Sequence, residues 1–346
     1  MANPVLVEVT RGPAVESRHR GSIAIVDASG RAIAAIGAVT DHVFPRSAVK
    51  PIQALPLVET GAADAFGYGA VELALACASH GGEPRHVAAV ENMLAAAGAD
   101  STGLECGPQW PSDEEARAAL WRSGRQPTAI HNNCSGKHAG FLAVARHRGW
   151  EISGYVAPDH PVQELVRQAL AEIAGTHLDA SVRGVDGCSI PAYSIPLDRL
   201  AFGFARFVTG EGLSEIRAAA ARRLIEACQS EPFFVAGTGR FCTQAMTIFG
   251  KRLIVKTGSE GVFCAGFPEH GLGAAVKCDD GAARAAEVMM GTVIAAVLKP
   301  QEPEMQRFRH RLRTPVSSRN GLPVGEVRPS PALVDLLSLA DAWILG

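Results

Sequence analysis

Residues 22–37 read SIAIVDASGRAIAAIG, in which two apolar runs flank a turn at 27–30 that ends in glycine. Short apolar runs on both sides of such a turn are typical of a β-hairpin. PVLVEVT (4–10) predicts another strand just before it. Late in the chain, three further runs predict strands: RLIVKT (252–257), GVFCAGF (261–267) and GAAVKC (273–278). The predicted strands therefore lie at the two ends of the chain.

The middle of the chain is predicted to be helical. Pro84 in a first turn and Gly98 at the end bound one helix, which runs from Glu83 to about residue 97. The capping-box pattern SDEE (112–115) begins another, which ends near Arg122. Further helices are expected at 138–148, 161–174, 197–208, 213–228, 281–298 and about 330–343, with a surface connection at 299–327.

Strands at both ends around a helical middle predict an α+β fold, in which the two chain ends pair into one antiparallel sheet. The strand runs lack the βαβ rhythm of a doubly wound parallel fold. We expect a single catalytic domain over residues 1–346, with an α/β lobe built from both chain ends and a helical lobe at about 70–230.

Composition excludes several classes of function. Apolar residues make up 47% of the chain, enough for a sizeable core. The 33 basic and 35 acidic residues give a net charge of −2, which provides no basic surface for nucleic acid. No apolar run of about 18 residues predicts a membrane helix, and no signal peptide is evident. The near-neutral charge favours a small-molecule substrate. The eight cysteines are scattered, so we expect reduced thiols and a cytoplasmic location.

The stretch FPRSAVKPIQALP (44–56) carries the first chemical signal. Ser47 and Lys50 are three residues apart, so on a helical turn they share a face. A serine hydroxyl becomes a good nucleophile when a neighbouring base takes its proton, and a lysine of lowered pKa can be that base. Pro51 fits a first helical turn, which places Ser47 near a helix N-terminus. By itself the tetrad is also compatible with solvent-facing helix residues.

The run Lys256-Thr257-Gly258 closes a predicted strand. A Ser-x-x-Lys tetrad early and Lys-Thr-Gly late is the layout of penicillin-recognising enzymes, and together they favour a serine acyl-transfer enzyme. The alternative is that Lys256 ends a strand and Gly258 forms a turn. No Ser-Asp-Asn motif is evident, which argues against a true β-lactamase.

Two polar loops add further candidates. Ser79-His80-Gly81-Gly82 follows an apolar helix, and its glycines let the backbone approach a ligand, although a plain interhelical loop explains it as well. HNNCSGKHAGF (131–141) and VDGCSIP (185–191) each hold a cysteine among turn-forming residues. Cys188 could join a group within the first segment to bind one metal ion: His131, Cys134, Lys137 and His138. The spacing is not that of a structural zinc motif, and unliganded loop cysteines remain the alternative.

Taken together, these segments resemble the serine-type, inducible L-asparaginase family first associated with rhizobia. The matching stretches run through about three quarters of the chain: SRHRGSIAIVDASG (17–30), FPRSAVKPIQALPLVETGAADAFG (44–67), LACASHGGE (75–83), HNNCSGKHAGFLA (131–143), GVDGCSIP (184–191) and KTGSEGVFCAG (256–266). The resemblance implies a fold similar to serine β-lactamases and glutaminases, a homodimer, and hydrolysis of L-asparagine to L-aspartate and ammonia.

The resemblance also implies roles for individual residues. Ser47 and Lys50 would be nucleophile and base, and Ser79 with Lys256 would be a second serine–lysine pair. A zinc site made of two cysteines and a lysine falls on Cys134, Lys137 and Cys188. Arg46, His80 and Asp186 match neighbouring positions and are candidates for substrate contacts, an arginine for the α-carboxylate and an aspartate for the α-amino group.

Two other functions are compatible with the same residues. One is a serine amidase or esterase of penicillin-recognising type that acts on another small acyl substrate. The other is a catalytically silent zinc-binding protein on the same scaffold, although the presence of both serine–lysine pairs argues against it.

Overall fold

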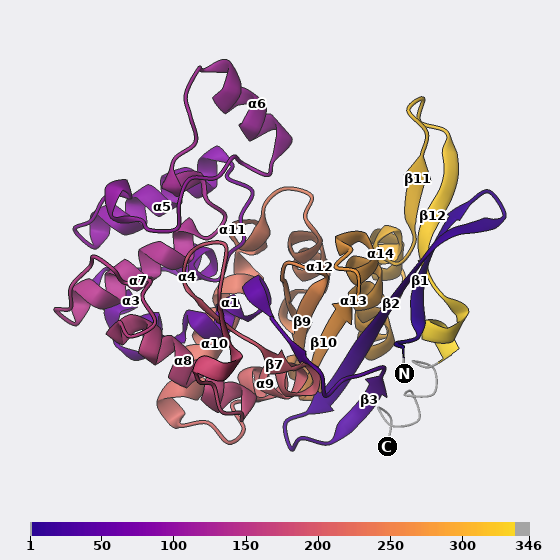
Figure 1. The fold of residues 1–346 in the computed structure, drawn as a ribbon, viewed down its shortest axis with the longest axis horizontal. Helices are drawn as coiled ribbons and strands as arrows, with labels where there is room; N and C mark the ends of the chain where they lie inside the picture. Colours follow the sequence, from indigo (N-terminus) through magenta and orange to yellow (C-terminus); the bar gives the residue numbers. More distant parts are fainter. Residues whose placement is uncertain (1, 336–346) are drawn as a thin grey trace. The chain divides into compact units, whose positions relative to one another are not determined.

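The computed structural model describes residues 2–335, which form two compact units (Figure 1). The sheet unit contains the residues up to 48, 195–211 and those from 252 onward, and the helical unit contains 49–194 and 212–251. A single catalytic domain over 1–346 stays a prediction.

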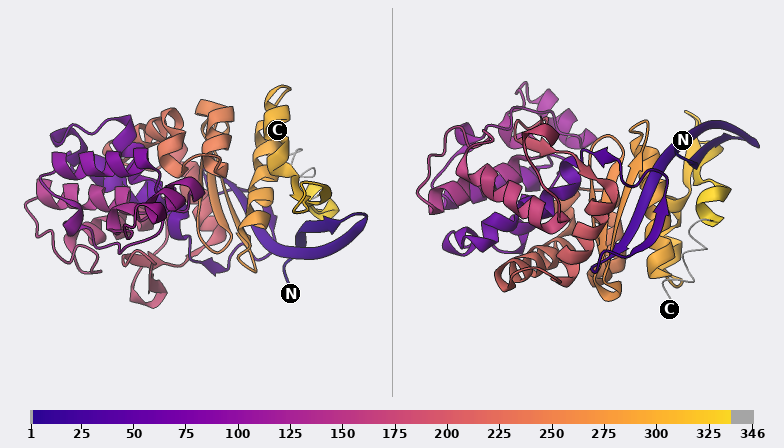
Figure 2. Two further views of the ribbon diagram at one scale, coloured as in Figure 1. Left: turned by 90° about the horizontal axis from the view of Figure 1, so that it is seen from above. Right: turned by 60° about the horizontal axis from the view of Figure 1, so that its bottom comes forward.

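An eight-stranded antiparallel sheet forms the sheet unit, and its strands come from both ends of the chain (Figures 1 and 2). The strand order is β11-β12-β1-β2-β10-β9-β8, with β3 paired to β2. The strands are β1 (Val5–Arg11), β2 (Ala14–Asp27), β3 (Ala32–Ile36), β8 (Ile254–Thr257), β9 (Val262–Phe267), β10 (Leu272–Cys278), β11 (Thr314–Ser317) and β12 (Pro323–Pro329). The α+β class, with one antiparallel sheet built from both chain ends and a helical middle, is confirmed.

Helices cover the two faces of this sheet: α9 (Leu197–Thr209), α13 (Ala283–Leu298) and the shorter α14 (Glu304–Leu312). A Cβ at Gly273 would collide with Ala201 of α9, and a Cβ at Gly21 would meet Met289 of α13. Gly21 pairs with Cys278, five residues along β10 from Gly273. Because side chains alternate along a strand, α9 and α13 lie on opposite faces of the sheet.

The connection expected at 299–327 is wrong. This segment forms α14, β11 and most of β12, and β12 pairs with both β1 and β11. Its strand pattern is weak because β11 is a short edge strand that contains Pro315. The partner of β12 is β1, about 300 residues away in the sequence, so no local pattern indicates that pairing. The helix expected at about 330–343 lies partly outside the described residues.

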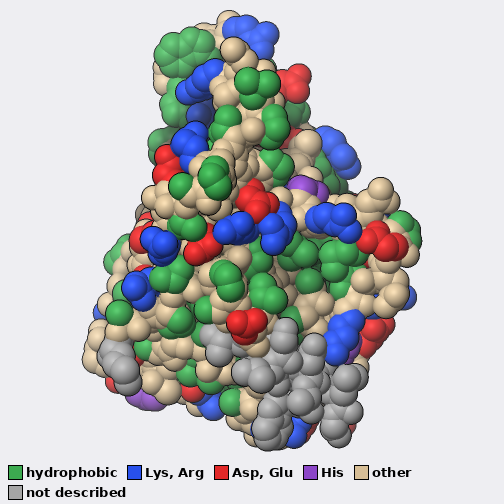
Figure 3. Space-filling view, turned by 90° about the vertical axis from the view of Figure 1, so that its right-hand side faces the viewer, with side chains coloured by type: hydrophobic (Ala, Val, Ile, Leu, Met, Phe, Trp, Pro, Cys, Tyr) green, Lys and Arg blue, Asp and Glu red, His purple; other side chains and the backbone are tan. Residues whose placement is uncertain are grey.

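One face of the sheet unit carries mixed charge. Figure 3 shows basic and acidic side chains interspersed over this side of the molecule. Arg328 pairs with Glu8 at 3.2 Å and Arg313 pairs with Glu326 at 2.7 Å, linking β12 to β1 and to the end of α14. Such partly exposed pairs contribute little to stability, but in each of them a basic side chain is balanced by an acidic one.

The helical unit is built around α7 (Ser135–His147), which is buried from Ser135 to Ala145. It contacts α4 (Ala70–Ala76), α5 (Pro84–Ala96) and α8 (Pro161–Ala174). The other helices of this unit are α1 (Lys50–Gln53), α2 (Leu55–Glu59), α3 (Ala62–Ala65), α6 (Glu114–Arg122), α10 (Glu215–Ser230), α11 (Pro232–Ala236) and α12 (Phe241–Phe249). None of the helices within residues 2–335 has both the length and the apolar character needed to cross a bilayer.

Candidate active site

Lys50 is the first residue of α1 and is only 1% exposed. Its Nζ donates to the carbonyl oxygen of Ala78 at 2.5 Å and to Ser79 Oγ at 2.9 Å. Pro51 stands in the first turn of α1, as the sequence predicts, where its missing N–H costs no helical hydrogen bond. A buried lysine amine that contacts a serine hydroxyl can exchange a proton with it, which is the arrangement that serine–lysine catalysis needs.

The loop that carries Ser79 is fixed by its backbone. It leaves the end of α4, and the Ser79 N–H donates to the carbonyl oxygen of Val235 at 2.9 Å. The next N–H, of His80, donates to the carbonyl oxygen of Asn133 at 3.2 Å. These bonds tie the loop to α11 and to the segment before α7, so the Ser79 hydroxyl is held in place without help from a ligand.

Close packing brings α7 to this loop. A Cβ at Gly136 would collide with the backbone and side chain of Leu75, so only glycine permits the approach of α7 to α4. Cys134 and Lys137 stand on either side of this glycine. The run CSGK (134–137) thus places both candidate ligands on the part of α7 that packs against α4.

Cys134, Lys137 and Cys188 form a buried cluster in the helical unit. Lys137 Nζ donates to Cys188 Sγ at 3.2 Å, and all three side chains are at most 5% exposed. A hydrogen bond from Cys188 is the main cause that holds the pKa of the Cys134 thiol well below its usual value, and the charges of Lys50 and Lys137 act in the same direction. Burial opposes the charge on Lys137, but the two sulfurs raise its pKa above the usual value.

Cys188 reaches this cluster from a hairpin loop between β5 (Arg183–Val185) and β6 (Pro191–Tyr193). Asp186 closes the loop: its N–H donates to the carbonyl oxygen of Ile190 and its own carbonyl oxygen accepts from the Ser189 N–H, each at 2.9 Å. Ser189 has a φ of 75°, a conformation that costs energy for a residue with a side chain. The charge of Asp186 also raises the pKa of Lys137, so this carboxylate lies near the cluster.

The donor set of this cluster fits a zinc ion. Two thiols and an amine converge. Zinc commonly binds sulfur and nitrogen ligands, whereas magnesium and calcium prefer oxygen ligands. The lowered pKa of the Cys134 thiol favours the thiolate form that a metal ion binds. Binding would require the Cys188 thiol and the Lys137 ammonium to lose their protons.

The histidines of the two loops make other contacts. His131 Nδ1 accepts from the Thr128 N–H at 3.1 Å, and His138 Nδ1 bonds the Tyr155 hydroxyl at 2.7 Å. His80 Nδ1 accepts from the Gly82 N–H at 3.1 Å, and its Nε2 lies 2.9 Å from Ser135 Oγ. These contacts place a proton on Nε2 of His80. The substrate contacts predicted for His80 and Asp186 stay predictions.

Ser47, Arg46 and Lys256 belong to the sheet unit. Ser47 lies in a 3₁₀ helix over Arg46–Val49, and Arg46 before it has a φ of 51°. A Cβ at Gly258 would collide with the carbonyl oxygen of Pro45 and lie 3.3 Å from the Ala48 nitrogen. The Lys-Thr-Gly run therefore lies beside the segment that holds Ser47, as the predicted layout requires.

Lys256 is 1% exposed, and its Nζ donates to the carbonyl oxygen of Thr257 at 3.0 Å. The pairing of this lysine with Ser79 stays a prediction, as does the contact of Arg46 with substrate.

Sequence reasoning missed two residues that support the cluster, Tyr155 and Asn132. The Tyr155 hydroxyl accepts from the Glu105 N–H at 2.8 Å and lies 2.7 Å from Nδ1 of His138, the residue after Lys137. Asn132 donates to the carbonyl oxygens of Cys106 and Gly107 and accepts from the Cys134 N–H at 2.9 Å. The polar run HNN before Cys134 was the signal that could have pointed to Asn132.

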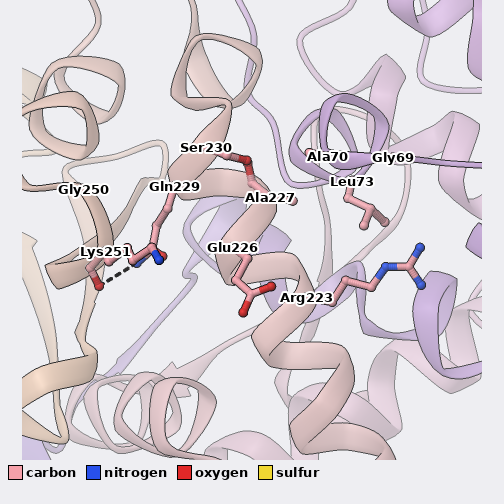
Figure 4. A pocket seen from close by; sticks show the side chains of 10 residues that line it. All are labelled: Gly69, Ala70, Leu73, Arg223, Glu226, Ala227, Gln229, Ser230, Gly250 and Lys251. Atoms are coloured by element: carbon pink, nitrogen blue, oxygen red, sulfur yellow. Dashed lines mark hydrogen bonds between the residues drawn. The ribbon is translucent and has the colours of Figure 1, made fainter.

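The helical unit also contains a cavity of 510 Å³ away from these groups (Figure 4). Its lining comes from the start of α4, the end of α10 and the turn after α12, and includes Arg223, Glu226 and Lys251. None of the candidate catalytic or metal-binding side chains is among the described residues that line it.

Comparison with known proteins identifies the family. The family model of L-asparaginase II matches residues 7–329. Among solved structures, the chain is similar to Mglu, with 15% identity over 81% of this chain and 67% of that chain and a TM-score of 0.35. It is also similar to a beta-lactamase from Mycobacterium bovis, with 15% identity over 80% of this chain and 94% of that chain and a TM-score of 0.40. No curated protein matches the chain.

The chain belongs to the L-asparaginase II family, since the family model spans nearly all of it. It is an amidohydrolase of the asparaginase family.

Proposed function

We propose that this protein is an L-asparaginase that hydrolyses L-asparagine to L-aspartate and ammonia with a serine nucleophile and a lysine base. The observation that carries the proposal is the buried contact of 2.9 Å between Lys50 Nζ and Ser79 Oγ. Family membership supports the amide substrate. The short chain distance from Ser47 to Lys50 supports the base, and the strained φ of Arg46 directly before Ser47 is typical of a functional turn.

In the proposed reaction, Lys50 as a neutral amine takes the proton of Ser47 while Ser47 Oγ attacks the side-chain amide carbon of asparagine. The C–N bond then breaks, and the leaving nitrogen departs as ammonia after it has received that proton. Ser79, in contact with Lys50, would relay the proton. Water next hydrolyses the aspartyl ester, which releases aspartate and restores the Ser47 hydroxyl. Lys256 keeps the role that the family resemblance implies, a second amine for the same chemistry.

We propose that Cys134, Lys137 and Cys188 hold a zinc ion when it is bound. A zinc ion there would supply positive charge and fix the ends of α7 and of the β5–β6 loop. Asp186 lies in that loop, so the ion would order the carboxylate that we propose binds the α-amino group of substrate. Two further substrate contacts are proposed. Arg46 would bind the α-carboxylate, and His80 would contact the substrate from the loop that carries Ser79.

Two further properties are proposed on other grounds. The eight cysteines are buried and scattered along the chain, which supports a cytoplasmic location where thiols stay reduced. A homodimer is proposed from the family resemblance.

The test is ammonia release from L-asparagine and L-glutamine by the wild type, Ser47→Ala and Ser79→Ala, with zinc content measured on the same samples. We expect asparagine turnover in the wild type and a loss of at least about 100-fold in Ser47→Ala. The surface variant Ser153→Ala is the matched control and should behave as the wild type. Near-full activity of Ser47→Ala would make Ser79 the nucleophile.

A second candidate is a serine amidase or esterase that acts on another small acyl compound. The approach of Gly258 to the Ser47 segment favours it, because that layout is shared by penicillin-recognising enzymes. Turnover of a p-nitrophenyl ester or of nitrocefin without turnover of either amide would decide for it. Tight zinc binding without turnover of any of these compounds would decide for a silent zinc-binding protein.

A further inference from the structure

Three side chains with metal-binding atoms meet in the sheet unit, outside the machinery described above. They are His19 of β2, Cys278 at the end of β10, and Asp280 just before α13. One potential ligand atom from each lies within 4.8 Å of those of the other two. We propose that these residues form a second metal site, for a divalent transition metal such as zinc.

The sheet register explains why these residues meet. Cys278 pairs with Gly21 across β2 and β10, and directly opposed residues point to the same face. His19 stands two residues from Gly21 and therefore points to that face as well. Gly21 has no Cβ that would occupy the space between Met289 of α13 and the strand. The imidazole and the thiol are thus directed toward the start of α13.

Asp280 joins them through a tight set of hydrogen bonds. Its Oδ2 lies 2.6 Å from His19 Nδ1, and its Oδ1 accepts from the Cys278 thiol at 2.9 Å and from the Ala282 N–H at 3.0 Å. Ligand atoms around a tetrahedral zinc ion stand about 3.4 Å apart, given metal–ligand distances of about 2.1 Å. The three groups need to separate by less than about 1 Å to admit an ion, a change that side-chain rotation at the half-exposed Asp280 can supply.

The hydrogen bonding of His19 is incomplete without a ligand. Its side chain is 6% exposed, and its Nε2 is buried with no partner. A buried ring nitrogen without a partner carries a free-energy cost. An ion that replaced the His19–Asp280 hydrogen bond would release the imidazole from that bond. The ring could then rotate or change its tautomer, so that Nε2 could gain a partner.

The charge and type of the donors select the metal. A thiolate, a carboxylate and a neutral imidazole carry two negative charges, which match a divalent ion. The reaction balances when the ion displaces the Cys278 thiol proton to solvent and the imidazole binds through a neutral nitrogen. Sulfur disfavours magnesium and calcium, whereas zinc and cobalt accept all three donor types. Three protein ligands leave a fourth position open, on the side where Asp280 meets solvent.

Cobalt is a suitable probe because its bond to a thiolate absorbs in the near ultraviolet. The full-length variant Cys134→Ser/Cys188→Ser removes the thiols of the other cluster, so that cluster contributes no thiolate absorption. We expect one equivalent of cobalt with thiolate absorption in that background. Adding Cys278→Ser should abolish the absorption, and adding Asp280→Asn should weaken binding at least about tenfold. Adding Cys264→Ala, a buried cysteine of the neighbouring strand β9, should change neither.

The outcomes are decisive in either direction. Absence of thiolate absorption in the double variant, or absorption that survives Cys278→Ser, would overturn the proposal. Should a cysteine variant fail to fold, the metal content of the otherwise unmodified chain with and without Asp280→Asn tests the proposal, since Asp280 is half exposed and asparagine keeps an oxygen for the Ala282 N–H. A loss of one equivalent supports the site, and equal content with equal affinity overturns it. This test is independent of whether the protein is an asparaginase.

Discussion

Lys50 Nζ lies 2.9 Å from Ser79 Oγ, and both side chains are buried. The two residues are 29 positions apart in the sequence, and each is held by its own element, Lys50 by α1 and Ser79 by the loop after α4. The second acceptor of the amine, the Ala78 carbonyl, belongs to the same loop. Lys50 is therefore aimed at the Ser79 loop by two hydrogen bonds, which makes this lysine the most informative position to change.

Replacing Lys50 should abolish catalysis. In Lys50→Met the base is lost while the length of the side chain is kept, and we expect asparagine turnover to fall at least about 100-fold. Lys50→Arg should not restore it, since a guanidinium does not give up its proton in proteins. The measurement is kcat for ammonia release, with circular dichroism to verify the fold.

The matched control for Lys50 is Lys251→Met, which changes an exposed lysine that lines the cavity of Figure 4. It should keep wild-type turnover. Wild-type kcat in Lys50→Arg would remove proton transfer from the role of Lys50 and leave only a positioning role.

Removing a cluster thiol should release the metal. Cys188→Ser replaces one of two sulfur ligands, so we expect zinc affinity to drop at least about 100-fold. Affinity should also weaken as the pH falls, because protons compete for the thiols and the amine. Zinc titration with a chromogenic chelator at several pH values checks both. Cys228→Ala, a buried cysteine in α10, is the control, and equal affinity in both variants would remove Cys188 from the ligand set.

A single methyl group at Gly258 should disturb the nucleophile. The new Cβ would collide with the Pro45 carbonyl oxygen and crowd the Ala48 nitrogen, so the turn that holds Ser47 must shift. We expect Gly258→Ala to lower kcat at least about tenfold, because small displacements of a reacting group cost large factors in rate. Gly103→Ala is the control, since its Cβ would meet nothing closer than 3.7 Å. Equal activity of the two variants would show that the segment tolerates the shift.

Much of this fold could be predicted from the sequence because its signals are local. The β2–β3 hairpin and the late strands show apolar runs that end at turns, and helices such as Pro161–Ala174 show their caps. By contrast, β12 depends on β1, which is distant in the chain, and β11 in turn pairs only with β12 among the described strands. Their own residues are proline-rich and polar, so the pairing energy that makes them strands is not visible in them.

The candidate site divides in the same way. Spacing within a helical turn links Cys134 with Lys137, and the chain itself links Ser47 with Lys50. The contact of Lys50 with Ser79 requires the packing of α1 against the loop after α4, which no spacing encodes. The sequence also grouped His131 and His138 with the thiols, whereas side-chain geometry directs them to Thr128 and Tyr155. His131 accepts from a backbone N–H in its own turn, whereas His138 bonds the side chain of a residue 17 positions away, a contact that no local spacing encodes.

The His80 and His86 rings stack with centroids 5.0 Å apart, and both are buried. Burial lowers the pKa of both rings, and the charges of His86, Lys50 and His131 lower the pKa of His80 further. The groups that act on His86 are the Phe233 carbonyl, Glu83, Arg85 and Asp113. The folded protein therefore binds fewer protons than the unfolded chain below the ordinary histidine pKa of about 6.5.

Stability should accordingly be fully present above about pH 6.5 and fall as the pH drops below it, by about 1.4 kcal/mol per pH unit for each buried neutral ring. His86→Phe keeps a ring against Phe233, whose centroid lies 4.4 Å away, but removes one of the two titrating groups. We expect this variant to lose some stability at every pH, because the bond from His86 Nε2 to the Phe233 carbonyl is gone, yet to show a shallower decline between pH 6.5 and 5. Urea unfolding across that range measures the slope, and His177→Gln, which changes a histidine whose side chain is 82% exposed, should keep the wild-type slope. Parallel slopes for the wild type and His86→Phe would mean that the ring pair does not set the acid sensitivity of the fold.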